Sequence, residues 1–493
     1  MIIDAIAKNN VRDVYNFQNW KDENLYYAFT DRFENGDRSN DFDVDPKDLR
    51  KYHGGDFQGI INKLDYLRDI GVTTLWISPF VDNEKDGYHG YWPADFYRVE
   101  EHFGDPEKLK ELVDKAHEKG LKVIADMVIN HTGYNHSWVQ DPAYHDWFHH
   151  YGKVKLPTQW WMEHGELSGL PDLAHENPEV SDYVIRMAKY WIDRTGVDGF
   201  RLDAIKYVSH DFLKRFAEEI HRHAGSKFLL VGEDFSRDPE HLARYQKEGI
   251  DTLFDMPLNQ AIRSAIGDEG KSWVGRLVEG LRNVKKAPLM ETLRKVTTHP
   301  GDLREISRVL SKDRYYVDPN LLTIFIDNHD LSRFLTEAKG DGKEKLKLAL
   351  DFLFTVRGVP SILYGTETGM DGGNDPDNRR DMEWAQNPDI TAHYRKLCEI
   401  RNAHVALRQG ALKELWCDRN VYAFSRYHKD KDHEEEVIVL LNNSKHDQYR
   451  EIPLSEKKNL AAEDLLHEEK LSFSEGKIKI TLKPREARIL KVL

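Results

Sequence analysis

The chain has 493 residues, more than one ordinary domain requires, so we expect a large core unit with something smaller beside it. Lys and Arg total 71, Asp and Glu total 85, and the net charge of -14 argues against nucleic acid or an anionic membrane as a main partner. Two cysteines form no disulfide framework, and the sequence shows no leader pattern and no apolar run long enough to span a bilayer. We expect a cytoplasmic protein, although a mature secreted form whose signal had been replaced by Met1 would look the same.

Short apolar runs recur between Leu25 and Glu367, and amphipathic helical stretches separate them. Runs buried on both faces imply a parallel sheet, and eight of them suggest a closed (β/α)8 TIM barrel of the α/β class. Gly120 and Gly196 are plausible stops of the helices before them. The predicted strands are Leu25–Phe29, Thr74–Ser78, Lys122–Ile129, Gly199–Asp203, Phe228–Glu233, Thr252–Asp255, Leu322–Ile326 and Ser361–Tyr364, with helices over Pro106–Lys119, Asp182–Arg194 and His210–His223.

Two connections are too long for ordinary loops of such a barrel. Residues His131 to Glu176 predict a small inserted lobe after the third strand, and Gln260 to Asp313 predict extra helices on the outer shell. After His404 the pattern changes to alternating strands, expected at Val421–His428, Glu436–Leu441, Lys477–Leu482 and Ala487–Leu493. We therefore predict a barrel of residues 1–131 and 176–405, a lobe of residues 132–175 and a C-terminal antiparallel β-sandwich of residues 406–493.

Arg201 and Asp203 lie two positions apart on the fourth predicted strand, so their side chains point to the same face. Burying them is costly unless they pair, and the Arg would then hold the carboxylate ionised at neutral pH. The pair provides an anionic nucleophile, but an internal salt bridge without chemistry explains this stretch equally well.

The ends of the other predicted strands favour chemistry, because in such barrels function sits at the C-terminal ends of the strands. The fifth strand ends in Glu233, the seventh runs into Asp330, and the third ends in His131. Glycoside hydrolysis needs two facing acids, one ionised and one protonated. Asp203 suits the ionised role, whereas desolvation and nearby anions would raise the pKa of Glu233 and keep it protonated.

Seven stretches form an ordered set along the chain. Four of them are Asp126–His131, Gly199–Tyr207, Gly232–Glu233 and Phe325–Asp330, and three more are Gly71–Pro79, Leu170–Leu173 and Gly358–Gly365. In their order along the chain, these stretches resemble the signature regions of the α-amylase family of glycoside hydrolases, the family 13 type. The resemblance extends from about Leu25 to about Arg380.

The resemblance implies that Asp203 is the nucleophile, Glu233 the acid/base and Asp330 the transition-state stabiliser of a retaining enzyme. In retaining enzymes the two carboxyl groups lie about 5 to 5.5 Å apart. The resemblance also implies that Asp126 orients Arg201. Residues implied to bind sugar are His89, Tyr91, His131, Arg201 and His329 around the cleaved unit, and Asp375 and Arg379 farther out in the donor half. Candidates for the acceptor side are Lys206, Trp160 and Trp161, although aromatic packing explains the two tryptophans equally well.

Two calcium sites are also expected. Asn35 to Asp41 places four carboxylate or amide side chains within seven residues around a glycine, as Ca²⁺ requires, although a solvated polar turn explains this stretch alone at least as well. With Gly54–Asp56 it resembles a calcium loop of cyclodextrin glycosyltransferases and some amylases. The likeness implicates Asn35, Asp37, Asn40, Asp41, the carbonyl of Gly54 and Asp56, and the family's other site, between barrel and lobe, would use Asn130 and Asp172 with the carbonyl of Tyr207.

Taken together, the sequence predicts a monomeric, calcium-binding hydrolase of α-1,4-linked glucans such as starch, or of maltooligosaccharides. The lobe is short, and no extra domain of the kind expected in cyclomaltodextrinase relatives precedes the barrel. A transglycosylating 4-α-glucanotransferase or a cyclomaltodextrinase-like enzyme stays open, as does a non-catalytic sugar-binding protein. The last of these would be expected to lack catalytic carboxylates, whereas all three are present.

Overall fold

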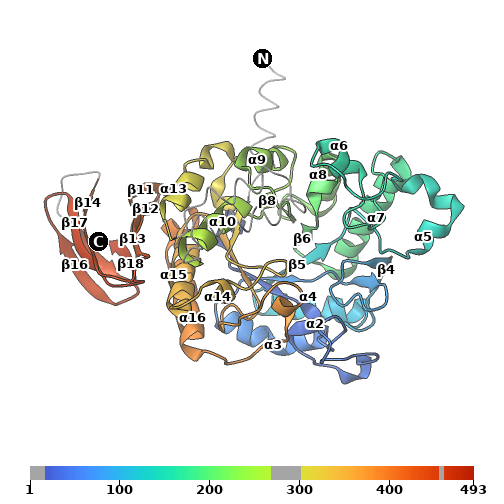
Figure 1. Ribbon diagram of the computed structural model, residues 1–493, viewed down its shortest axis with the longest axis horizontal. Coiled ribbons are helices and arrows are strands. Elements are labelled where there is room, and N and C mark those ends of the chain that lie inside the picture. The colour runs from blue at the N-terminus through green and yellow to red at the C-terminus, as the bar shows by residue number, and fades with distance from the viewer. Residues whose placement is uncertain (1–16, 268–300, 455–459) are drawn as a thin grey trace, which may run out of the picture.

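A computed structural model describes residues 17–267, 301–454 and 460–493 of the chain (Figure 1). Eight parallel strands form its central sheet in the order β8-β7-β6-β5-β2-β1-β10-β9, and a parallel bridge between Phe254 and Thr323 joins the two outer strands. The sheet is thus closed into a barrel, and the predicted fold class is confirmed. The strands are β1 (Leu25–Ala28), β2 (Thr74–Ile77), β5 (Lys122–Met127), β6 (Gly199–Leu202), β7 (Leu229–Gly232), β8 (Thr252–Leu253), β9 (Thr323–Phe325) and β10 (Val359–Leu363).

Helices cover the outside of the barrel, and their ends carry the residues that such ends favour. Asp105, Asn177 and Ser209 each cap a helix start through a side-chain oxygen, and Gly120 and Gly196 lie at the ends of the helices with φ of +77° and +76°. The larger helices are α3 (Phe57–Asp69), α4 (Pro106–Glu118), α7 (Pro178–Thr195), α8 (His210–Ala224), α9 (Pro239–Lys247), α10 (Met256–Ile262), α13 (Arg304–Leu310), α15 (Gly342–Thr355), α16 (Pro388–Ala403) and α17 (Val405–Gln409).

Shorter elements fill the connections. Of the extra helices predicted between Gln260 and Asp313, the structure shows α10, a π-helical turn η5 (Arg263–Gly267) and α13, while residues 268–300 lie outside the described residues. The remaining short helices of the barrel unit are η1 (Phe17–Asp22), α2 (Thr30–Phe33), η2 (Arg38–Asn40), η4 (Ile205–Tyr207), η6 (Asp313–Tyr315), η7 (Pro319–Leu321), α14 (Phe334–Glu337) and η8 (Asp377–Arg379). Among the described helices, none has the length and apolar character that crossing a bilayer requires.

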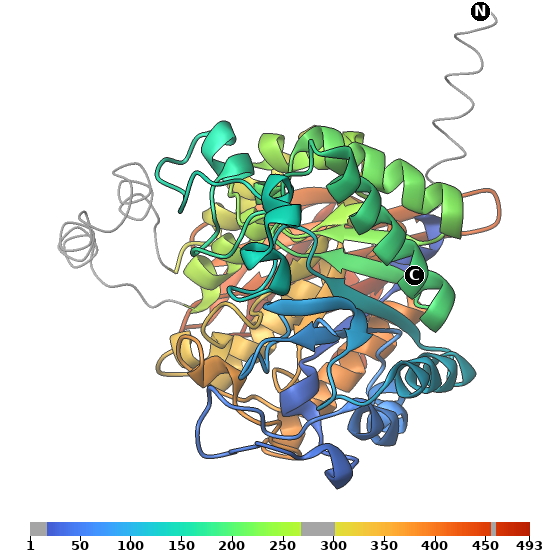
Figure 2. The same ribbon diagram turned by 90° about the vertical axis from the view of Figure 1, so that its right-hand side faces the viewer.

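Two excursions project from the C-terminal ends of the strands. After β2 the chain forms an antiparallel pair, β3 (Val81–Asn83) and β4 (Pro93–Val99), which the sequence did not predict. After β5 it forms a lobe of short helices, as expected: α5 (Ser137–Gln140), η3 (Pro142–Trp147) and α6 (Gln159–His164). In Figure 2 this lobe stands in front of the green helices that follow it in the chain.

The C-terminal part is an antiparallel β unit at one end of the molecule (Figure 1). A six-stranded sheet in the order β11-β12-β13-β18-β15-β16 faces a two-stranded sheet, β14-β17. Tyr422 and Phe424 belong to the barrel core, whereas Val421 and Ala423 belong to a second core with the two-stranded sheet, as strand alternation requires. The strands are β11 (Ala411–Cys417), β12 (Val421–Lys429), β13 (Glu434–Asn442), β14 (Gln448–Pro453), β15 (Leu460–Asp464), β16 (Glu469–Phe473), β17 (Lys477–Leu482) and β18 (Ala487–Val492).

Candidate active site

The register of three neighbouring strands brings the expected acidic residues together. Asp126 of β5 pairs with Arg201 of β6, and Leu202 of β6 pairs with Gly232 of β7. Asp203 and Glu233 are the next residues of β6 and β7, so they leave adjacent strands side by side. The Glu233 N–H donates to the Leu202 carbonyl at 3.1 Å, which continues the ladder to this point.

Arg201 lies close to three carboxyl groups of the site. Its Nη1 lies 2.9 Å from Asp126 Oδ1 and 2.7 Å from Asp203 Oδ1, and its Nη2 lies 3.6 Å from Glu233 Oε2. Arg201 and Asp126 are both buried, so neither charge would be tolerated there without the other. The pairing of Arg201 with Asp203 that the strand alternation predicted is therefore present, and Asp203 faces a buried guanidinium at 2.7 Å.

Glu233 is in a different environment. It is buried, its Oε2 accepts a 3.0 Å hydrogen bond from the Ala204 N–H, and its Oε1 has no hydrogen-bond partner among the described residues. Burial raises the pKa of Glu233 strongly; Arg201 lowers it, while the negative charges of Asp203 and Asp330 raise it further. A carboxyl group in this position keeps its proton at neutral pH and has one oxygen free to donate it.

Tyr91 connects the aromatic residues of the site to the charged group around Arg201. Its hydroxyl lies 2.8 Å from Asp126 Oδ2 and 2.8 Å from His329 Nε2, and the two rings are nearly parallel, with centroids 5.4 Å apart. Burial and the neighbouring Arg379 and Arg201 lower the pKa of His329 well below its ordinary value. His329 is thus neutral, and Tyr91 presents a ring face whose position is fixed at its hydroxyl end.

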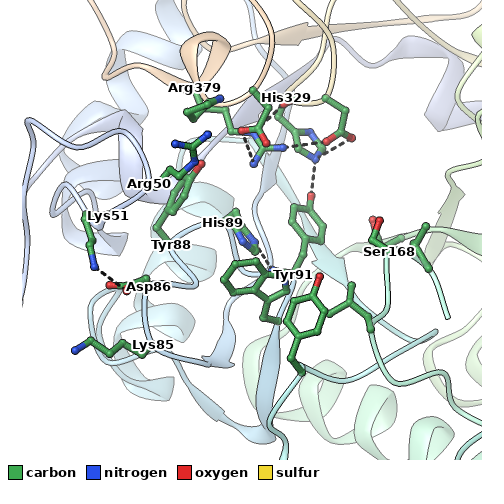
Figure 3. A pocket seen from close by; sticks show the side chains of 18 of the residues that line it. Arg50, Lys51, Lys85, Asp86, Tyr88, His89, Tyr91, Ser168, His329 and Arg379 are labelled. Atoms are coloured by element: carbon green, nitrogen blue, oxygen red, sulfur yellow. Dashed lines mark hydrogen bonds and ion pairs between the residues drawn. The ribbon is translucent and has the colours of Figure 1, made fainter. Parts of the chain in front are cut away.

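The two other histidines are held by the backbone around Tyr91. His89 Nδ1 accepts from the Tyr91 N–H at 3.0 Å, and His131 Nε2 lies 3.2 Å from the Tyr91 carbonyl. Burial lowers the pKa of both histidines. Both rings are therefore neutral hydrogen-bonding groups beside the same tyrosine. In Figure 3, His89 is seen below His329 and Arg379.

Asp330 is the most exposed of the three acids, with 32% of its side chain exposed against 13% for Asp203 and 5% for Glu233. Arg379 donates from Nη2 to Asp330 Oδ1 at 3.1 Å and from Nε to the His329 carbonyl at 2.8 Å (Figure 3). The same guanidinium lies 3.3 Å from the exposed Asp375. Arg379 therefore connects Asp375, which the sequence placed farther out, to the residues of the central group.

Two adjoining cavities open at this end of the barrel, with volumes of about 740 Å³ and about 350 Å³. Both are lined by Asp203, Asp330 and Leu167, so the acids lie where the cavities meet. The larger one holds His89, Tyr91, His131, His329, Asp375 and Arg379 (Figure 3), and the smaller one holds Glu233 and Lys206. All of the catalytic and sugar-binding residues predicted from the sequence except the buried Arg201 line this cleft.

The cleft also contains residues that the sequence reasoning missed, and it lacks two that were considered. Neither Trp160 nor Trp161 lines either cavity, although α6 packs against η4, which carries Lys206. Phe235, 43% exposed, lines the smaller cavity two residues after Glu233, and its place after a strand end was the available signal. The larger cavity adds residues from distant loops that were not predicted to bind sugar: Asp48, Arg50, Lys51, Lys85, Asp86, Tyr88, Trp92, Tyr134, Leu167, Ser168, Leu170 and Pro376.

Residues of the first expected calcium loop lie close to one another and to the start of α3. Asn35 Nδ2 lies 2.9 Å from Asp41 Oδ1, and Asp56 accepts N–H bonds from Gly36 and Asp37 while it caps α3. Asn40 Oδ1 is buried and has no hydrogen-bond partner within the described parts of the chain. An oxygen-rich loop with three carboxylates, those of Asp37, Asp41 and Asp56, and an unpartnered amide oxygen fits a hard cation.

The second expected site fits a calcium ion less well. Asn130 Nδ2 lies 3.2 Å from Asp172 Oδ1, and Asn130 Oδ1 is buried without a partner in the described residues. The other oxygen of Asp172 lies 2.6 Å from His149 Nδ1. One oxygen of Asp172 is therefore engaged by an imidazole of the lobe, which the sequence did not suggest.

The chain is similar to known proteins in both sequence and structure. A sequence model described as alpha amylase, catalytic domain, matches residues 27–392. A β/α-amylase of Paenibacillus polymyxa is 37% identical over 494 residues, and the match covers 95% of this chain but only 38% of that relative. A cyclomaltodextrinase of Thermoanaerobacter pseudethanolicus is 34% identical, with 97% and 79% covered. A solved α-amylase of Anoxybacillus has a TM-score of 0.86 at 37% identity, with 96% and 98% covered.

Proposed function

The chain belongs to the α-amylase family of glycoside hydrolases, and we propose that it cleaves α-1,4-glucosidic bonds of starch or maltooligosaccharides with retention of configuration. The observation that carries the proposal is the placement of Asp203 and Glu233 on one guanidinium, where two cavities meet. One acid is paired with Arg201, and the other is buried with a free oxygen. This difference in environment is what a retaining glycosidase requires of its two acids.

The reaction follows from these two groups. The Asp203 carboxylate attacks the anomeric carbon, the bond from that carbon to the glycosidic oxygen breaks, and Glu233 gives its proton to the departing oxygen. Glu233, now a carboxylate, then takes a proton from water, whose oxygen attacks the same carbon and releases Asp203. Asp330, held by Arg379, stabilises the positive charge that develops on the sugar ring. A separation of about 5 to 5.5 Å between the two carboxyl groups stays a prediction for this chain.

The remaining residues of the cleft bind the sugar in this proposal. Tyr91 offers a ring face for the unit that is cleaved, and His89, His131 and His329 offer neutral nitrogens to its hydroxyl groups. Asp375 and Arg379 bind the next donor units in the larger cavity, and Lys206 binds the first acceptor unit in the smaller one. A chain of glucose units would thus cross from one cavity to the other past Asp203.

We also propose that the loop of residues 35–41 with Gly54 and Asp56 holds a structural Ca²⁺ ion. Asn35, Asp37, Asn40, Asp41, Asp56 and the carbonyl of Gly54 would be its ligands. When bound, the ion offsets the repulsion among the carboxylates and fixes the loop against the start of α3. The ion has no part in the bond cleavage itself, because none of its ligands lines the cleft.

Transfer of the glycosyl group to a second sugar is the other candidate activity. Phe235 lines the acceptor cavity and is 43% exposed there, so it offers an apolar surface to an incoming sugar ring rather than to water. Opening of cyclodextrin rings is a third candidate activity, because one relative is named a cyclomaltodextrinase.

Two measurements test the proposal. Wild-type protein should release reducing sugar from soluble starch, and Asp203→Asn should not; equal release by both would overturn it. Chromatography of the products from starch, maltotriose, pullulan and a cyclodextrin then separates the candidates. Oligosaccharides longer than maltotriose arise from maltotriose only by transfer, and rapid loss of the cyclodextrin indicates ring opening.

A further inference from the structure

The inserted lobe contains a cluster of metal-ligating side chains outside the cleft. His149 follows η3, His164 is the last residue of α6, and Glu176 lies just before α7, so three separate segments contribute one group each. One ligand atom from each residue lies within 4.8 Å of the other two. The expected calcium ligands do not include any of the three, and the mechanism above does not use them.

Hydrogen bonds at one ring nitrogen of each histidine orient its other ring nitrogen toward this cluster. His149 Nδ1 lies 2.6 Å from Asp172 Oδ2, which leaves Nε2 directed at Glu176 Oε1, 2.8 Å away. His164 Nδ1 lies 2.9 Å from the Trp160 carbonyl, and the Trp160 ring stacks on His164 with centroids 4.9 Å apart. A carboxylate or a carbonyl on the far nitrogen is the arrangement that fixes metal-binding histidines in proteins.

Burial differs across the cluster in a way that suits an ion entering from solvent. The His149 side chain is only 6% exposed, whereas that of Glu176 is 65% exposed. Two imidazoles and one carboxylate are donors that Zn²⁺ and its neighbours prefer, and a fourth position can be taken by water. Calcium would not choose this set, because it prefers oxygen ligands alone.

We propose that His149, His164 and Glu176 form a binding site for Zn²⁺ or a similar divalent transition metal in the lobe. Such an ion joins α6 to the start of α7. Because α6 packs against η4, and Lys206 of η4 lines the smaller cavity, the ion holds this wall of the acceptor side in place. Asp172 acts as the outer partner of His149 and also contacts Asn130, three residues after β5, so the site is tied to the barrel.

The test uses the full chain stripped of transition metals and kept in excess Ca²⁺, so that the calcium loop does not interfere. Zn²⁺ uptake is measured by calorimetry and by metal analysis, and Co²⁺ is used as a probe because its visible absorption reports low coordination number. We expect one ion per wild-type chain, with a rise in melting temperature. Glu176→Gln and His164→Gln should weaken binding tenfold or more, because loss of even a supporting partner of a metal ligand costs about 10- to 100-fold in affinity and these two residues are ligands.

His145→Gln is the matched control, because His145 belongs to the same lobe, is exposed and lies outside the cluster. It should bind Zn²⁺ like the wild type. The proposal is overturned if wild type takes up no ion, in which case His149 serves only as a charged bridge between Asp172 and Glu176. It is also overturned if all four proteins bind equally, which would place the metal elsewhere. Circular dichroism of each variant shows whether the fold is kept.

Discussion

Replacing Glu233 by Gln is the sharpest test of how the two acids divide their roles. The amide has the same shape and can still accept from the Ala204 N–H, but it has no proton to give. General acid catalysis contributes about 10² to 10⁴ in rate, which corresponds to about 2.7 to 5.5 kcal/mol of transition-state stabilisation. We therefore expect kcat/KM on starch to fall by about 10² to 10⁴ in Glu233→Gln.

A substrate whose leaving group needs no proton distinguishes loss of the general acid from general damage to the site. Fluoride departs without protonation, so α-maltosyl fluoride should react with Glu233→Gln in the first step at a rate within about tenfold of wild type. Azide should then restore turnover, because an anion needs no general base to attack the glycosyl-enzyme. If starch and the fluoride lose rate equally, and azide has no effect, Glu233 is not the acid/base and the reasoning fails.

The raised pKa of Glu233 adds a pH dependence with a definite sign. For wild type, kcat/KM on starch should fall as pH rises through this pKa, because the acid loses its proton. Folded protein binds that proton more tightly than unfolded protein, so wild-type stability should also fall as pH rises from the ordinary Glu value toward the raised one. Glu233→Gln removes the group, so urea denaturation across pH should show that this decline is absent from the variant.

Three further outcomes follow from the geometry. Tyr91→Phe removes the hydroxyl that lies 2.8 Å from Asp126, so unfolding free energy from urea titration should fall by about 1.5 to 3 kcal/mol; no change would contradict the buried bond. Gly54→Ala places a Cβ 2.5 Å from Asp41 Oδ1, so the rise in melting temperature on adding Ca²⁺ should shrink; Gly225→Ala, at a similar positive φ but with open space around the added Cβ, should keep that rise. Phe235→Ala should lower the ratio of transfer to hydrolysis products from maltotriose; an unchanged ratio removes its acceptor role.

The barrel was predictable because its strands are buried on both faces and therefore appear in the sequence as separate apolar runs. Strands at the sheet edges give no such signal. β11 is mostly exposed or half-buried, and in β14 exposed side chains alternate with half-buried or buried ones. The pair β3 and β4 was missed for another reason. It contains two register shifts over a few residues, so no regular alternation is present for a pattern to detect.

The acids of the site were predictable because each lies just beyond the C-terminal end of a strand, and these ends of parallel strands meet at one rim. The wall of the larger cavity was not, because it depends on contacts between distant loops. Lys51 comes from the segment before α3 and Asp86 from the turn between β3 and β4, yet they pair at 2.7 Å (Figure 3). His149 on Asp172 is a similar case, since nothing in either stretch of sequence indicates the other.

The register between β6 and β7 sets the positions of the two acids, and this register depends on glycines that take no part in the reaction. A Cβ on Gly199 would lie 2.6 Å from the Leu229 carbonyl, and one on Gly232 would lie 2.5 Å from Ile205 and 2.8 Å from Leu253. Both positions therefore allow the two strands and the segment after β6 to approach closely. Because a shift of one residue turns every side chain to the opposite face, this close contact is what keeps Asp203 and Glu233 on the same side of the rim.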